Sequence, residues 1–204
     1  MQTDSFLARL LPLLAILLIG TGILTFVGSM TEERIMENTK QRRMALMSAV
    51  LPEDSHENRR AEIIETMEAE LAGEDRILYI YRQWSDDQPD GISMFPVIAR
   101  GYSNRIILTV GITPDNTISG VRVVEQNESP GLGDQIHQSK SDWLHQFTGL
   151  SLDIMQPEDW AIRNDQGKFD TLTGATITSR SVINAVHKAA EIYAIRKETF
   201  YSLR

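Results

Sequence analysis

The chain has 204 residues, which is enough for one domain with its own hydrophobic core and a short appendage but too few for two full domains. Its formal net charge of −8 argues against nucleic acid as a partner. It contains no cysteine, which excludes disulfides, thiol catalysis, thioether haem attachment and cysteine-ligated iron–sulfur clusters, so any redox role requires a borrowed cofactor.

The first predicted element is an apolar helix over residues 10–30, which follows a short tail over residues 1–9. Leu10 to Met30 contains no charged side chain, and a helix of that length spans the roughly 30 Å hydrocarbon layer of a bilayer. A cleaved signal peptide is the alternative, since Val27-Gly28-Ser29 could serve as a cleavage site. The apolar stretch exceeds the roughly 7 to 15 residues of a signal h-region, which favours a membrane anchor.

Residues 31–75 are expected to form a helical connector. The first helix should continue to about Val50, where Leu51-Pro52 stops it. A second, polar helical stretch is expected over residues 59–71, because its apolar residues fall on one helical face: Ile63, Ile64, Met67 and Leu71.

Residues 76–204 are expected to form the folded domain. Residues 77–82 and 95–100 are rich in β-branched and aromatic side chains and predict two strands, separated by a turn over residues 86–91. Residues 105–113 and 117–126 flank Pro114-Asp115-Asn116 and predict a β-hairpin.

Two helices complete the predicted domain. Asp134 can cap a helix that Gly149 ends, and residues 179–196 predict the final helix. Because the paired strands are adjacent in sequence and helices are interspersed among them, we expect an α+β fold with an antiparallel sheet.

The first loop suited to chemistry runs from Asp170 to Thr178, just before the final predicted helix. Gly174 and Ala175 have little side chain, so backbone N–H groups there could approach an anion, and a helix N-terminus favours phosphate. Thr176 presents a hydroxyl where a phosphoryl ester would be reachable. The same residues also suit an ordinary helix cap after a tight turn, so the spacing permits a flavin phosphate site without identifying it.

The second loop is Glu128-Ser129-Pro130-Gly131-Leu132-Gly133, which by composition is a turn after a strand. It resembles the Glu-Thr-Pro-Gly-Leu-Gly segment of FMN-binding domain proteins, with Ser129 in place of threonine. Asp170-Thr171-Leu172-Thr173-Gly174-Ala175-Thr176 resembles the sequence that flavin transferases modify in that family. There FMN is joined through its phosphate to the last hydroxyl residue of the motif, which is Thr176 in this chain.

The resemblance extends over most of the chain to one branch of the family, the G subunit of Rnf-type electron transport complexes. The C subunit of the sodium-pumping NADH:quinone oxidoreductase is the nearest alternative. The resemblance implies ring contacts from Glu128 and Leu132. The remaining cofactor-binding residues that it implies are Leu172, Thr173, Gly174, Ala175, Thr178 and Gly133.

In function, the resemblance implies a bacterial inner-membrane subunit with its FMN domain on the periplasmic side, relaying electrons in a ferredoxin- and NAD-linked chain coupled to ion movement. The expected partners are other membrane and peripheral subunits, a flavin transferase and the lipid bilayer. We expect no catalytic side chain and no metal ligand. The competing hypothesis is a cofactor-free extracytoplasmic scaffold or binding domain, which would not require a hydroxyl at Thr176.

Overall fold

The computed structural model describes residues 3–52, 59–73 and 77–202. The chain divides into two compact units, Met1–Arg43 and Met44–Arg204. The first unit is helical and forms most of α1 (Thr3–Ser48), whose last turn belongs to the second unit. The second unit holds all the strands and the remaining helices.

The first unit presents its described apolar side chains to the outside. Leu14, Leu24 and Phe26 have exposed fractions of 58%, 75% and 64%. The part of the chain that the structure describes contains no helix with the length and apolarity needed to cross a membrane. The expected span over residues 10–30 lies partly outside the described side chains, which within that range are those of residues 12 and 14–26.

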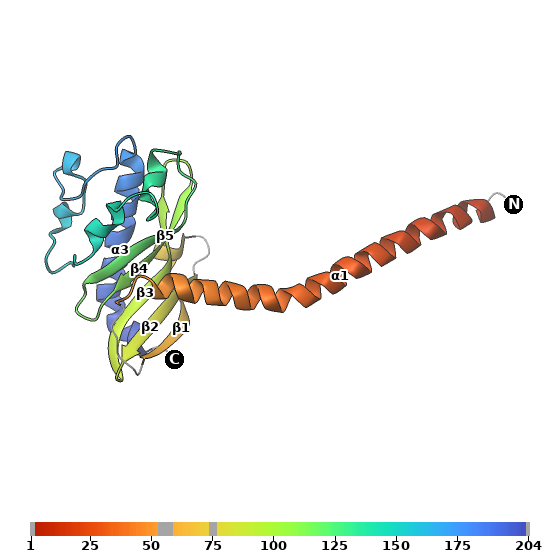
Figure 1. Cartoon of the computed structure of the whole chain (residues 1–204), viewed down its shortest axis with the longest axis horizontal. Coiled ribbons are helices and arrows are strands. Elements are labelled where there is room, and N and C mark those ends of the chain that lie inside the picture. The colour runs from red at the N-terminus through yellow and green to blue at the C-terminus, as the bar shows by residue number, and fades with distance from the viewer. Residues whose placement is uncertain (1–2, 53–58, 74–76, 203–204) are drawn as a thin grey trace. The chain divides into compact units, whose positions relative to one another are not determined.

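The second unit is built on a five-stranded antiparallel sheet, which confirms the predicted α+β class (Figure 1). Its strands are β1 (Arg59–Met67), β2 (Ile77–Ser85), β3 (Gln88–Arg100), β4 (Arg105–Ile112) and β5 (Ile118–Glu125), and they lie side by side in chain order. Asp86 and Asp87 both have positive φ, as expected for a two-residue hairpin turn, so β3 begins earlier than predicted.

The helix predicted over residues 59–71 is wrong. Arg59 to Met67 pairs along its whole length with β2, and only Ala69–Ala72 forms a short helix, α2. The reason lies in Ile63 and Ile64, because consecutive strand residues point to opposite faces of a sheet. Ile64 packs against the main core and Ile63 against the cluster on the other face, so both isoleucines are covered.

Different elements pack on the two faces of the sheet. On one face α3 (Thr176–Ser202) packs across β3 and β4 and encloses the main core (Figure 1). On the other, Met47 in the last turn of α1 and Leu51 just after the helix pack on Tyr81. Because β4 is covered from both sides, every residue after Arg105 in that strand is buried.

The single helix predicted to run from Asp134 to Gly149 is also wrong. The segment contains two short 3₁₀ helices, η2 (Gly133–Ile136) and η3 (Trp143–Phe147), joined by extended backbone at His137. Asp134 accepts a hydrogen bond from the Gly131 N–H at 2.7 Å and pairs with Lys140, so its carboxylate fastens the preceding loop instead of capping a long helix. Two further short 3₁₀ helices follow, η4 (Pro157–Asp159) and η5 (Arg163–Asp165).

Two isoleucines on α3 provide a matched test of the packing against the sheet. Ile183 is fully buried, whereas Ile195 is 82% exposed on the same helix. We expect Ile183→Ala to lower the free energy of unfolding by about 2–5 kcal/mol through lost burial and a residual cavity. Ile195→Ala should change it by no more than about 0.5 kcal/mol. Denaturant unfolding of both full-length variants measures this, and equal losses would contradict the packing described.

Candidate functional site

The two loops singled out in the sequence meet at one cleft in the second unit. Its cavity volume is about 550 Å³, within the roughly 300–1,000 Å³ of small-molecule and cofactor sites. The lining residues are Tyr102, Glu128, Ser129, Leu132, Gly133, Gly174, Ala175, Thr176, Ile177 and Thr178. Leu172 and Thr173 do not line it: Leu172 lies in the hydrophobic core and Thr173 is exposed.

Thr176 is the first residue of α3 and is half-buried. The helix is capped by the residue before it, because the Ala175 carbonyl accepts the first intrahelical bond from the Ser179 N–H at 2.9 Å. The N–H groups of Thr176, Ile177 and Thr178 therefore belong to the first turn, where a helix supplies no acceptors of its own. The Thr176 hydroxyl stands at the positive end of the helix dipole, a place that favours phosphate.

The backbone before Thr176 is shaped by a glycine and a buried hydroxyl. Gly174 has a φ of +74°, a left-handed conformation that side chains disfavour. The buried Ser179 Oγ accepts the Leu172 N–H at 3.1 Å and donates to the Ala175 carbonyl at 3.0 Å. The loop and the start of α3 are thus fastened together without help from the Thr176 side chain.

The beginning of the same loop is held at Asp170. Its carbonyl accepts the Trp143 indole N–H at 2.8 Å, and its N–H donates to the Gln146 side chain at 2.9 Å. Arg163 donates to its carboxylate at 2.5 Å. Residues from η3 and η5 therefore fix where the loop starts, and Ser179 fixes where it ends.

Glu128 is a buried carboxylate, 6% exposed, that joins three segments of the cleft. One oxygen accepts the Tyr102 N–H and the other the Ser103 N–H, each at 3.0 Å, and the Thr178 hydroxyl also donates to it. Burial by itself raises the pKa of Glu128, but these donors outweigh it and hold the pKa below its ordinary value. Glu128 is therefore an ionised support of the cleft.

Two glycines make room for this carboxylate. A Cβ on Gly101 would lie 2.3 Å from the Glu128 Oε1, and one on Gly133 would lie 2.9 Å from both its Oε2 and the Thr178 Oγ1. The loops also touch directly, because a Cβ on Gly174 would meet Leu132 Cδ2 at 2.8 Å. The two loops, about 40 residues apart in the chain, form one wall.

Sequence reasoning did not select three of the lining residues as cofactor contacts: Ser129, which lies within the second loop, Tyr102 and Ile177. Tyr102 lies in the turn between β3 and β4, and Ile177 follows Thr176 on the exposed side of α3. Two features of the sequence could have indicated Tyr102 and Ile177. Tyr102 is an aromatic residue in the polar turn Gly101-Tyr102-Ser103-Asn104, and Ile177 does not fall on the face of the final helix that the apolar pattern predicts to be buried. Both side chains are more than half exposed.

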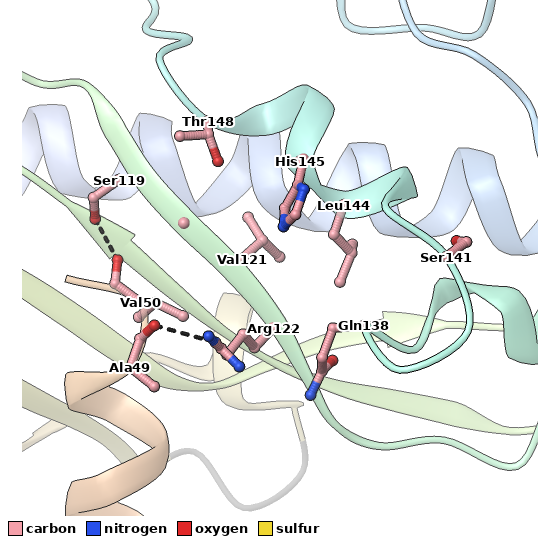
Figure 2. A pocket seen from close by; sticks show the side chains of 11 residues that line it. Ala49, Val50, Ser119, Val121, Arg122, Gln138, Ser141, Leu144, His145 and Thr148 are labelled. Carbon is pink, nitrogen blue, oxygen red and sulfur yellow. Dashed lines mark hydrogen bonds between the residues drawn. The ribbon is translucent and has the colours of Figure 1, made fainter. Parts of the chain in front are cut away.

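A second cavity, of about 490 Å³, lies where the end of α1 meets β5 and η3 (Figure 2). Ser119 donates to the Val50 carbonyl at 2.6 Å, and Arg122 donates to the Ala49 carbonyl at 3.1 Å. These bonds satisfy the carbonyls of the two residues that follow the end of α1. The cavity thus adjoins the fastening of α1 to the sheet, and none of the predicted cofactor residues lines it.

The described residues contain no cluster of three or more histidine, aspartate or glutamate side chains able to hold a metal ion. The histidines at 137, 145 and 187 lie on different elements: 137 follows η2, 145 belongs to η3 and 187 to α3.

The family described as FMN-binding domain matches residues 101–191, a range that includes both loops. The chain is 37% identical over 195 residues to the G subunit of the ion-translocating oxidoreductase complex of Pseudoalteromonas atlantica, covering 95% of this chain and 89% of that protein. It is 39% identical over 176 residues to the corresponding G subunit of Salmonella typhi, covering 86% and 84%.

Among solved structures, NqrC of Shewanella oneidensis has a similar fold. Its TM-score is 0.51 at 18% sequence identity, and the match covers 72% of this chain and 86% of that one.

The carboxylate that supports the cleft can be tested by Glu128→Gln. An amide has one acceptor oxygen for two backbone N–H donors, so we expect the free energy of unfolding at neutral pH to fall by about 1–3 kcal/mol. Because the folded-state pKa lies below the ordinary value of 4.5, the stabilisation is fully present above 4.5 and is lost as the pH falls through the folded pKa. The difference between variant and parent should therefore shrink under acid conditions.

Denaturant unfolding at a series of pH values measures both effects. Glu125→Gln is the matched control, because Glu125 is an exposed carboxylate at the end of β5. Equal stability of Glu128→Gln and the parent at neutral pH would show that the carboxylate does not hold the three segments together.

Proposed function

Because the chain belongs to the family of G subunits of ion-translocating oxidoreductase complexes, we propose that it is an electron-transfer subunit that carries FMN as a phosphoester on Thr176. In this function it relays electrons between partner subunits of an ion-translocating complex, within a chain linked to ferredoxin and NAD. A flavin transferase attaches the cofactor during maturation: the Thr176 oxygen takes the FMN phosphoryl group from a flavin dinucleotide, and a nucleoside monophosphate leaves as the hydroxyl loses its proton.

The observation that carries this proposal is the position of the Thr176 hydroxyl. It lies at the first residue of α3, inside the cleft that both loops build. Ala175, and not Thr176, occupies the capping position, and the described residues offer the Thr176 hydroxyl no hydrogen bond. Among the described contacts, the Thr176 hydroxyl therefore has no structural role. Attachment of a phosphate would account for a hydroxyl at this position.

The residues around the cleft fit the cofactor that the family implies. Small residues at Gly174 and Ala175 and the N–H groups of the first turn of α3 suit a phosphate. Leu132, Ile177 and Tyr102 offer apolar surface to a ring. FMN supplies a ring that takes up and releases electrons, and the protein binds it, orients it and limits its contact with water. Thr176 serves as a tether and takes no part in turnover.

The apolar part of α1 supports a second element of the proposal, a single-pass membrane anchor that leaves the FMN domain on the periplasmic side of the inner membrane. The described side chains of residues 14–26 include many exposed large apolar groups and no charge. Such a surface is unfavourable in water and is stabilised in a bilayer or against other apolar helices. Its partners are lipid and the other membrane subunits of the complex.

The covalent link is tested by two substitutions at one position. We expect the chain made together with a flavin transferase to show flavin fluorescence that survives denaturing electrophoresis, with the mass of one FMN less one water added. Thr176→Val, which keeps the side-chain shape without the hydroxyl, should lose this signal completely, whereas Thr176→Ser should retain part of it. Thr148→Ala, an exposed threonine outside the cleft, serves as the control.

An unmodified mass in the native host, with normal assembly of the complex, would support the cofactor-free scaffold instead. Labelling of Thr176→Val would place the flavin on another residue.

The anchor is tested by extraction of membranes. We expect the full chain to remain in the membrane pellet after alkaline washing, and replacement of Leu17 and Leu18 by aspartate to release most of it, because a charged residue in the middle of a span costs about 2.5–3.5 kcal/mol. Ile195→Asp, which alters an exposed apolar residue of the second unit, should stay in the pellet. Complete extraction of the unmodified chain would contradict an integral anchor.

A further inference from the structure

We propose that Tyr102 is the residue on which the isoalloxazine ring of the Thr176-linked FMN stacks, with Leu132 and Ile177 closing an apolar rim around the ring. This inference rests on the proposed function. It adds a positioning residue that lies outside both sequence motifs.

The first argument is the unusual exposure of the three side chains. Tyr102, Leu132 and Ile177 have exposed fractions of 71%, 44% and 52%, and all three line the cleft that contains Thr176. Large apolar side chains gathered at a cleft mark a surface that a ligand or partner covers, because covering it removes apolar area from water. A flat, largely apolar ring has the right character to do so.

The second argument is that the three side chains come from three separate segments. Tyr102 belongs to the turn between β3 and β4, Leu132 to the loop after β5, and Ile177 to the first turn of α3. Leu132 lies against Gly174, two residues before the attachment point, so the rim begins next to the tether. A flavin joined through its phosphate to Thr176 would therefore have this rim next to its point of attachment.

The third argument is that the backbone of Tyr102 is held in place before any ligand binds. Its N–H donates to the Glu128 carboxylate at 3.0 Å, and the Ser103 N–H donates to the other oxygen of that carboxylate. The Gly101 N–H closes the turn by donating to the Asn104 carbonyl at 2.9 Å. A preorganised turn lowers the entropic cost of ordering an aromatic side chain against a ligand.

The chemistry favours the tyrosine over the two aliphatic residues as the stacking partner. Aromatic rings prefer offset stacking on other aromatic rings, and Tyr102 is the one aromatic residue among those that line the cleft in the described structure. Leu132 and Ile177 offer edges and methyl groups to the same ring. A protein partner that covered the same rim is the competing occupant.

The test uses the full chain flavinylated by a flavin transferase, with Tyr102→Phe and Tyr102→Leu. A phenol close to an excited flavin quenches its fluorescence by donating an electron that then returns, whereas a phenyl ring does not. We expect both variants to keep FMN on Thr176 by mass and to fluoresce several-fold more strongly than the parent. Tyr102→Phe should preserve the visible circular dichroism of the bound flavin, because the ring still stacks, and Tyr102→Leu should weaken it.

Tyr201→Phe is the matched control, because it removes one phenol at the far end of the 27-residue α3 and should change neither signal. Fluorescence and dichroism that are unchanged in both Tyr102 variants would overturn the inference and assign the rim to a protein partner. Variants that fail to acquire FMN would overturn it as well, since they would assign Tyr102 to recognition by the transferase. Absence of FMN from Thr176 in the parent would instead refute the proposed function.

Discussion

The buried carboxylate of Glu128 is the interaction on which the arrangement of the cleft depends. A buried charge is unfavourable unless donors or an opposite charge compensate for it. Here the compensating donors are two backbone N–H groups of the β3–β4 turn and the Thr178 hydroxyl of α3. One side chain therefore ties together segments that are about 25 and 50 residues away in the chain, and Gly101 and Gly133 must lack side chains for it to fit.

The buried sheet beneath the cleft supplies the hydrophobic packing of the second unit, so the loops that form the cleft do not have to supply it. Helix α3 covers one face, and the last turn of α1 with the residues just after it packs on the other, so the central strands and β4 are buried. The end of α1 is fastened to β5 by Ser119 and Arg122, well away from Thr176 in sequence. The loops can then keep exposed apolar groups and a left-handed glycine, because the layers beneath them supply the packing.

The sequence predicts the features that neighbouring residues determine. It does not predict the features that depend on contacts between residues far apart in the chain. The β4–β5 hairpin, the stop at Leu51-Pro52 and the two loops follow from turn residues and patterns within a few positions. Residues 59–67 become a strand because β2 pairs with them and because the faces of the sheet receive Ile63 and Ile64 separately. In the sequence alone, the pattern of these isoleucines fits one face of a helix as well as it fits a strand buried on both faces. The backbone of Tyr102 is tied to the cleft by Glu128, 26 residues later in the chain, a contact that no local pattern encodes.

The structure bears on one of the two explanations of the Thr176 hydroxyl that the sequence leaves open, its role as a helix cap. A threonine just before a helix is commonly its cap. In this fold the helix starts at Thr176 itself, the capping carbonyl belongs to Ala175, and the Ser179 hydroxyl fastens the loop by accepting the Leu172 N–H. Thr178, two residues later, is engaged by Glu128. Of the hydroxyls in this turn, the one at Thr176 combines access to the cleft with freedom from structural duty among the described residues, which is the combination that a covalent tether requires.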